Sequence, residues 1–126
     1  MNLRTLHAAT AAVFGASLIV QVFLAGLAIP QLGGNGSFAM HRDFGYLIGL
    51  ITLLVLVTAV IARIGRRRIA QSAGFLVLYV VQSSLPYMDP GLPAAAALHP
   101  VIALVMFGLA SWYARAVWNE RTLATA

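Results

Sequence analysis

Residues 40–68 read MHRDFGYLIGLITLLVLVTAVIARIGRRR, and this stretch decides the fold class. The run Phe44–Ala62 carries no charged side chain, and a helix that spans a bilayer needs about 20 apolar residues. Ionisable residues precede the run at positions 41–43, and four arginines follow it within positions 63–68. The stretch therefore predicts a transmembrane helix over about residues 41–63, with ionisable groups at both membrane surfaces.

The composition of the whole chain agrees with a membrane protein. Of its 126 residues, 61% are hydrophobic and 9% are charged, whereas soluble domains carry charge at roughly 25% of their positions. The chain has no cysteine, which excludes disulfides, thiolate metal sites, thiol catalysis and covalent attachment of haem. The net charge of +5 comes from arginines that flank apolar segments, so we expect membrane lipid and no nucleic acid as a partner.

Three further apolar stretches accompany this segment. The predicted spans cover residues 6–29, 41–63, 69–85 and 94–118. Short linkers rich in glycine, proline or arginine separate the spans, so consecutive helices must run antiparallel. The first run exceeds the 7–15 residues, roughly, of a signal-peptide core, and we expect it to be a true span. Residues 1–126 are therefore expected to form a single all-α transmembrane domain, an up-down-up-down four-helix bundle.

The arginines predict the orientation of this bundle. One lies before the first span, four lie between the second and third, and two lie at the end of the fourth. By the positive-inside rule, both termini and the second linker are cytoplasmic, and Arg42 faces the other side. Trp112, Tyr113 and Trp118 would then belong to the aromatic belt at the inner surface, and His7 would be an interface residue.

Polar residues from all four spans fall in the outer half of the bundle. They are Gln21, His41, Gln82 and His99. Polar groups in hydrocarbon are costly unless they face a partner, a cavity or a ligand, so their common depth predicts a shared site.

The two histidines of this set lie on the second and fourth helices, which are diagonal in such a bundle. Their axes are expected to be about 11–14 Å apart, too far for a direct histidine pair. That spacing suits one metal atom between two imidazoles, with a flat macrocycle across the line that joins them. His41 and His99 are the predicted metal ligands. Zinc, copper or the magnesium of a chlorophyll-type pigment is an alternative to haem.

Small residues flank each histidine at helical spacing. They are Gly45, Gly49, Ala95 and Ala103. They leave room for the edge of a porphyrin, but the same residues also permit close helix packing. Arg42 can pair with a haem propionate or with its neighbour Asp43. Met106, seven residues after His99, is expected to be a core residue.

Three short motifs carry a resemblance to a known family: HR at 41–42, VVQSSL at 80–85 and LHPVIAL at 98–104. In this order they resemble one four-helix half of haem A synthase, a relative of membrane b-type cytochromes. The resemblance implies that histidines on diagonal helices ligate haem near the outer face, which here are His41 and His99.

The chain also resembles a family of small four-span bacterial membrane proteins without an assigned activity. The motifs are VQVFLAGL at 20–27, HRDFGYLIGL at 41–50 and ALHPVIAL at 97–104. This resemblance covers nearly all of the chain and implies a multi-pass protein of the bacterial cytoplasmic membrane.

Departures from the synthase limit what can be carried over. The synthase joins two four-helix halves and uses an outer-loop carboxylate and, in many members, paired cysteines, whereas this chain has one half and no cysteine. Synthase chemistry is therefore not supported. The resemblance leaves His41 and His99 as candidate ligands and Gln21 and Gln82 as polar positions near the haem.

The expected function is that of a membrane protein with one non-covalent haem b, held by two histidines. It would transfer electrons to or from a quinone or another redox partner, or serve as a haem-bearing subunit. The alternatives are a structural small subunit of a larger membrane complex and a site for another metal or pigment. An enzyme is less well supported, because the membrane interior lacks carboxylate, cysteine and lysine side chains. Glycines outside the site predict a homo-oligomer or a larger complex, and they are Gly15, Gly26, Gly74 and Gly108.

Overall fold

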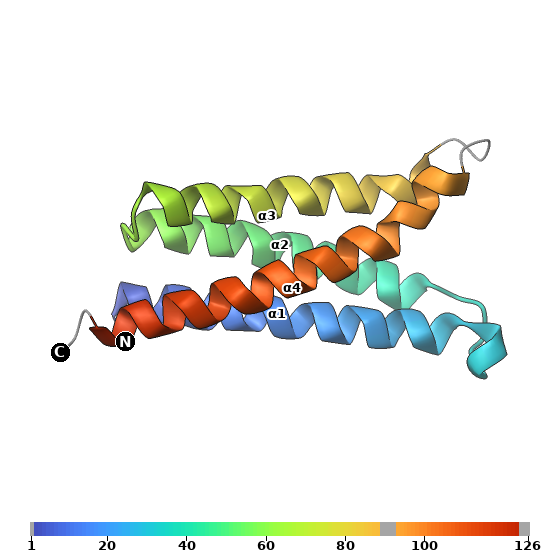
Figure 1. Ribbon diagram of the computed structural model, residues 1–126. Helices are drawn as coiled ribbons and strands as arrows, with labels where there is room; N and C mark the ends of the chain where they lie inside the picture. The colour runs from blue at the N-terminus through green and yellow to red at the C-terminus, as the bar shows by residue number, and fades with distance from the viewer. Residues whose placement is uncertain (1, 89–92, 124–126) are drawn as a thin grey trace.

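The computed structural model describes residues 2–88 and 93–123, and its regular elements are helices. Four long helices, α1 (Leu3–Ala28), α2 (Ala39–Ile61), α3 (Arg66–Ser84) and α4 (Pro93–Leu123), are joined in part by the short 3-10 helices η1 (Pro30–Leu32) and η2 (Leu85–Tyr87) (Figure 1). All four long helices have the length and hydropathy to cross a membrane. The chain is therefore an all-α protein of the multi-pass membrane class, which confirms the predicted fold class.

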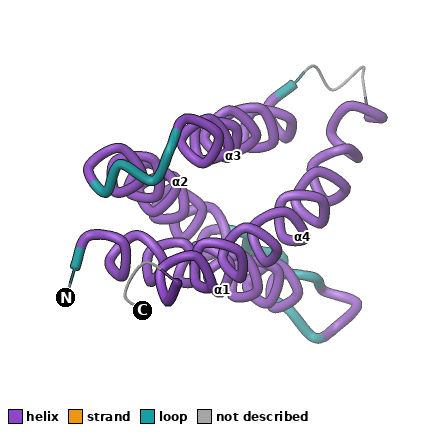
Figure 2. The backbone as a smooth tube through the Cα atoms, turned by 60° about the vertical axis from the view of Figure 1, so that its left-hand side comes forward, coloured by secondary structure: helices purple, strands orange, loops and turns teal. Residues whose placement is uncertain are grey.

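The four helices run antiparallel in chain order, and α1 packs against both α2 and α4. Figure 1 shows α4 crossing the bundle, close to α3 near η2 and close to α1 near the chain termini. The tube in Figure 2 shows α4 and α1 on one side of the molecule and α2 and α3 on the other. Helices α2 and α4 are thus diagonal, as the sequence predicts.

The two ends of the bundle differ in composition. Both termini and the α2–α3 turn lie at one end, which we call the arginine end because seven of the eight arginines belong to it (Figure 1). The η1 and η2 segments lie at the opposite end, which we call the η end. The side of the membrane that each end faces stays a prediction.

Local signals account for the helix boundaries. The Asn2 side chain caps α1 by accepting a hydrogen bond of 2.8 Å from the Thr5 amide. Helix α1 ends before Pro30, and a side chain at Gly34 would overlap the backbone of Leu27, so glycine is required there. The α2–α3 turn uses Gly65 at a φ of 97°, a conformation that side chains with a Cβ rarely adopt.

Alanine, aromatic and aliphatic residues from the four helices form the core, and many other large hydrophobic side chains are exposed. Met106 is fully buried in this core, which confirms its prediction. Tyr113 is only 1% exposed, so its assignment to the aromatic belt is wrong, whereas Trp112 and Trp118 are exposed. Helix α4 continues past residue 118 to Leu123. The prediction ended the span too early because the last turns of α4 are polar, and hydropathy detects only apolar turns.

Candidate functional site

The η end brings the two predicted ligand histidines together. His41 lies in the first turn of α2 and His99 in the second turn of α4. Their ring centroids are 6.1 Å apart, and the ring planes meet at 73° in an edge-to-face arrangement. The expectation that diagonal helices hold the histidines too far apart for direct contact is therefore wrong. Both side chains extend toward the bundle axis, and together they cover the distance.

Each histidine is oriented by a backbone carbonyl of the preceding helix. The Nδ1 atom of His41 lies 3.0 Å from the carbonyl oxygen of Gln21, and Nδ1 of His99 lies 2.7 Å from that of Gln82. A carbonyl oxygen only accepts hydrogen bonds, so Nδ1 is the donor in both rings. This leaves Nε2 as the atom with a free electron pair, which is the usual arrangement behind metal-binding histidines.

The Gln21 side chain makes two further contacts with His41. Its Nε2 atom donates a 2.8 Å hydrogen bond to the His41 carbonyl oxygen. The same nitrogen lies 3.3 Å from Nε2 of His41, to which it can donate a second, longer hydrogen bond. Gln21 thus fixes the start of α2 and covers the ring nitrogen that a metal would use.

The two hairpins α1–α2 and α3–α4 present the same pair of residues. In each hairpin the first helix supplies a glutamine carbonyl and the second a histidine ring. The sequence carries this relation as Val-Gln at 20–21 and 81–82, followed by Ala-Met-His at 39–41 and Ala-Leu-His at 97–99. The prediction from the sequence treated the four polar residues as separate positions and did not identify this repeat. It makes the site a pair of equivalent halves that face each other.

Two amide oxygens at this site are buried without a partner. Within residues 2–88 and 93–123, neither Oε1 of Gln21 nor Oε1 of Gln82 has a hydrogen-bond donor. Buried polar atoms without a partner are uncommon and call for a water, an ion or a ligand. The residues that hold the histidines thus also offer electron pairs, and the set His41, His99, Gln21 and Gln82 carries no carboxylate.

The predicted small residues near His41 are covered by other side chains. A Cβ at Gly49 would lie 2.5 Å from the Tyr79 ring, and a Cβ at Gly45 would lie 3.2 Å from the amide of Gln21. Tyr79 also donates a 3.1 Å hydrogen bond to the Gly45 carbonyl. In this structure the two glycines allow α2 to pack closely against α1 and α3.

The other predicted site residues lie at the margin. Ala95 and Ala103 are half-buried on α4, one turn before and after His99. Arg42 is exposed and forms a 3.1 Å ion pair with its neighbour Asp43. In the described part of the chain, no three histidine, cysteine, aspartate or glutamate side chains are grouped to hold a metal.

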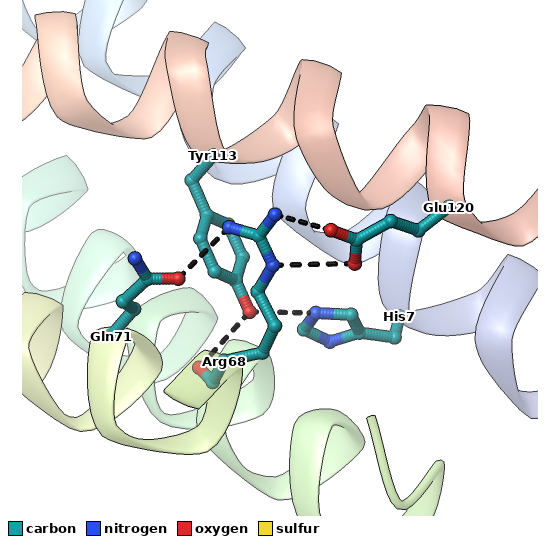
Figure 3. A network of polar contacts seen from close by, with 5 residues as sticks. All are labelled: His7, Arg68, Gln71, Tyr113 and Glu120. Carbon is teal, nitrogen blue, oxygen red and sulfur yellow. Dashed lines mark hydrogen bonds and ion pairs between the residues drawn. The ribbon is translucent and has the colours of Figure 1, made fainter. Parts of the chain in front are cut away.

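A second polar cluster lies at the arginine end and contains the third histidine. His7 is 1% exposed, with Nδ1 3.0 Å from Oγ1 of Thr58 and Nε2 2.9 Å from the hydroxyl of Tyr113. Thr58 donates its own proton to the Leu54 carbonyl at 2.7 Å, so it accepts from His7 Nδ1, and the other ring nitrogen is then an acceptor for the Tyr113 hydroxyl. The Tyr113 hydroxyl also lies 3.3 Å from the Arg68 carbonyl, to which it can donate the same proton (Figure 3). The Tyr113 oxygen is also 2.8 Å from Oγ of Ser72.

This cluster takes one residue from each of the four helices, and it corrects the assignment of His7 to the membrane interface. Because α1 begins at Leu3, His7 lies in its second turn and faces the bundle, where two hydroxyl groups satisfy both ring nitrogens. Hydropathy does not predict this arrangement, because Thr58, Ser72 and Tyr113 are far apart in the sequence and none of them by itself indicates a contact with His7.

Arg68 closes the cluster on the side of α3 and α4 (Figure 3). It binds both carboxylate oxygens of Glu120 and donates a 2.9 Å hydrogen bond to the Gln71 side chain. Its guanidinium carbon lies 5.4 Å from the ring centre of Trp112 and 5.6 Å from that of Tyr113. Such a partly buried, multiply bonded arginine ties the ends of two helices together.

Comparison with known proteins places the chain in a family. Residues 21–87 match a family of unknown function, DUF6220, and the match contains Gln21, His41 and Gln82 but ends before His99. Searches of curated proteins and of solved structures gave no match. Nothing in these comparisons links the chain to haem A synthase or to cytochromes. Since the match covers more than half of the chain, the protein belongs to the DUF6220 family, a family of unknown function.

Proposed function

We propose that the protein binds one haem b non-covalently, with His41 and His99 as the two axial ligands. In this role it transfers electrons or serves as a haem-bearing subunit in the bacterial cytoplasmic membrane. The observation that carries the proposal is the histidine pair itself: two imidazoles from equivalent hairpins, each with Nδ1 on a backbone carbonyl.

The separation of the rings supports one metal atom between them. A metal lies about 2 Å from an imidazole nitrogen, and that nitrogen lies about 1.1 Å from the ring centre, so two ligands in line have ring centres about 6 Å apart. The measured separation of the centroids is 6.1 Å. The separation of the ring centres therefore matches that of two ligands of a single metal, and binding would require the rings to turn from their edge-to-face contact and the Gln21 amide to leave Nε2 of His41.

The chemistry of the donor set also supports this assignment. Haem iron supplies one-electron redox chemistry when it is bound, and two histidine ligands leave no coordination site for oxygen. The Gln21 and Gln82 carbonyls orient the rings, and the exposed Arg42 can exchange Asp43 for a propionate. Ala95 and Ala103 add little bulk beside His99. Electrons would be exchanged at the η end with a quinone or another redox partner.

A second candidate, a bare transition-metal ion such as copper or zinc, is favoured by one observation. The Tyr79 ring covers Gly49 and the Gln21 amide lies against Gly45, so the space beside His41 that a macrocycle would use is filled. A haem, or a chlorophyll-type pigment, requires both of these side chains to move, whereas a single ion requires only that the Gln21 amide leave Nε2 of His41. The unpartnered oxygens of Gln21 and Gln82 could complete its coordination.

The absorption spectrum and the metal content of the purified protein separate these candidates. The protein is expressed with ample haem and purified in detergent, alongside His41→Ala, His99→Ala and the control Tyr46→Phe, whose side chain is exposed. The proposal predicts a six-coordinate, low-spin haem spectrum that both alanine variants lose and the control keeps. A colourless protein with stoichiometric copper or zinc would establish the bare ion instead. A protein without haem or metal would reject both, and leave a structural subunit.

A further inference from the structure

The two histidines at the η end differ in what their second ring nitrogen contacts. Both rings donate from Nδ1 to a glutamine carbonyl, so Nε2 of each ring has an electron pair to share. Nε2 of His41 lies 3.3 Å from the amide nitrogen of Gln21. Nε2 of His99 has no hydrogen bond to any residue within 2–88 and 93–123. The two proposed ligands are therefore unequal before any metal binds.

The orientation of the Gln21 amide follows from the same contacts. Its nitrogen lies 2.8 Å from the carbonyl oxygen of His41, which only accepts hydrogen bonds, so the nitrogen and not Oε1 must face α2. An amide nitrogen carries two protons, and the second can be donated to Nε2 of His41. Gly45, one turn after His41, leaves room for this amide, because a Cβ there would lie 3.2 Å from its nitrogen. The Gln21 side chain thus supplies His41 with a donor that the described chain does not supply to His99.

The contact between Gln21 and His41 is weak enough to be exchanged. At 3.3 Å it is longer than the range of about 2.7–3.2 Å that N–H donors usually show. Oε1 of Gln21 is buried and has no partner in the described part of the chain, so the amide loses little when it moves away from Nε2. A metal can therefore displace this amide from the ring, and the amide can return when the bond to the metal breaks.

This difference determines which ligand leaves a metal more easily. A partly buried ring that leaves a metal retains an electron pair, which costs free energy unless a donor binds it. The Gln21 amide is that donor for His41, and no described residue takes this role for His99. Displacement of His41 therefore costs less than displacement of His99, by about the contribution of one hydrogen bond.

The surroundings of His41 limit what can take its place on the metal. The Tyr79 ring covers Gly49 and the Gln21 amide covers Gly45, so a replacement ligand must be small. Arg42 is paired with Asp43, so an anionic ligand would find its nearest cation already bound. A small neutral molecule with an electron pair, such as carbon monoxide, meets both conditions.

We infer that His41 is the exchangeable ligand of the metal at this site, that Gln21 is the positioning residue that receives the displaced ring, and that a small neutral ligand takes the vacated position. His99 stays bound. The inference rests on the proposed ligation by His41 and His99 and extends it, because a haem with two histidine ligands takes a further ligand only after one of them leaves.

Zinc binding by each histidine alone tests this inequality without haem. His41→Ala leaves His99 at the site and His99→Ala leaves His41, and nuclear magnetic resonance of ring Nε2 during addition of Zn²⁺ gives each affinity. One hydrogen bond corresponds to a factor of about five, so His99 alone should bind Zn²⁺ about fivefold more tightly than His41 alone. Adding Gln21→Leu to His99→Ala should recover this factor, because the backbone carbonyl that orients His41 is kept. A purely structural role of Gln21 would give a loss of affinity instead of this gain.

The metal-free spectra provide a second measurement. Gln21→Leu should move the Nε2 resonance of His41 and leave that of His99 in place. Tyr46→Phe, which changes an exposed side chain, should move neither resonance. An unmoved His41 resonance in Gln21→Leu would overturn the role of Gln21.

Carbon monoxide tests the exchange in the reduced, haem-loaded protein. The Nε2 resonance that returns to its metal-free position identifies the displaced ring, which should be His41, and Gln21→Leu should weaken carbon monoxide binding about fivefold. Displacement of His99, no binding of carbon monoxide, or equal Zn²⁺ affinities of the two single-histidine variants would overturn the inference and leave the haem proposal intact. A protein that takes up no haem but shows the fivefold difference for Zn²⁺ would reject the haem and support the inequality of the two ligands.

Discussion

Replacing Tyr113 by phenylalanine tests whether the buried cluster at the arginine end holds the four helices together. The substitution removes one hydroxyl group and leaves the ring, which packs edge-to-face against Phe75, in place. The lost oxygen lies 2.9 Å from Nε2 of His7 and 2.8 Å from Oγ of Ser72. Ser72 keeps a 3.0 Å hydrogen bond to the Arg68 carbonyl, so only the imidazole nitrogen is left without a partner.

The loss of this hydrogen bond sets the expected change in the free energy of unfolding. A buried polar atom that loses its only partner costs about 1–3 kcal/mol. Hydrogen bonds between membrane helices average about 0.6 kcal/mol, because the unfolded chain in the membrane also finds partners. We therefore expect Tyr113→Phe to lower the free energy of unfolding by about 1–2 kcal/mol. Because the ring volume is nearly unchanged, no cavity term is added.

The free energy of unfolding can be measured by titration with a denaturing detergent and followed by circular dichroism. Tyr46→Phe is the matched control, because Tyr46 is 64% exposed, and its effect should stay within about 0.5 kcal/mol. A cycle that combines Tyr113→Phe with His7→Leu should show that the two effects are not additive. Additive effects, or a Tyr113→Phe variant as stable as the control, would refute the claim that this hydrogen bond stabilises the bundle.

Three further predictions follow from other parts of the structure. Gly49→Ala should lower the free energy of unfolding by about 1–3 kcal/mol, because the added Cβ meets the Tyr79 ring, and Tyr79→Leu should restore it. Gly74→Ala, where a Cβ meets open space, should be neutral or stabilising, and equal effects of the two alanine variants in unfolding titrations would contradict the packing argument. Reporter fusions at both termini should be active in the cytoplasm, and an external C-terminus would reverse the assigned orientation. Crosslinking in native membranes should give oligomers, because Gly108 is exposed and no other side chain of the described residues lies within 4 Å of a Cβ placed there, whereas Gly15 is buried inside the bundle. Monomers alone would contradict this prediction.

The four membrane-spanning helices could be predicted from the sequence, because the hydropathy of a segment depends only on its own residues. The run Phe44–Ala62 must form a helix in a bilayer whatever surrounds it, since its backbone groups have no other partners there. The burial of Met106 was expected on a different ground, because a flexible apolar thioether readily fills core space. The level of His41 and His99 was predictable as well, because position along a helix gives depth.

The distances across the bundle were not predictable in this way. Whether His41 and His99 touch depends on how far each side chain extends toward the bundle axis and on how α4 crosses α1, and neither follows from spacing along the chain. His7 was misplaced for a related reason. Its burial is favourable only because Thr58 and Tyr113, distant in sequence, satisfy its two nitrogens. Tyr79 likewise fills the space beside Gly49, which the sequence shows only as a small residue.

Electron paramagnetic resonance of the oxidised, haem-loaded protein tests the proposed ligation most directly. Two histidine ligands would fill both axial positions of a haem and give its ferric iron a low-spin signal. We predict one such signal, with one spin per chain, that is absent in His41→Ala and in His99→Ala. A high-spin signal, or a low-spin signal that survives either substitution, would contradict the assignment of these histidines as the ligands.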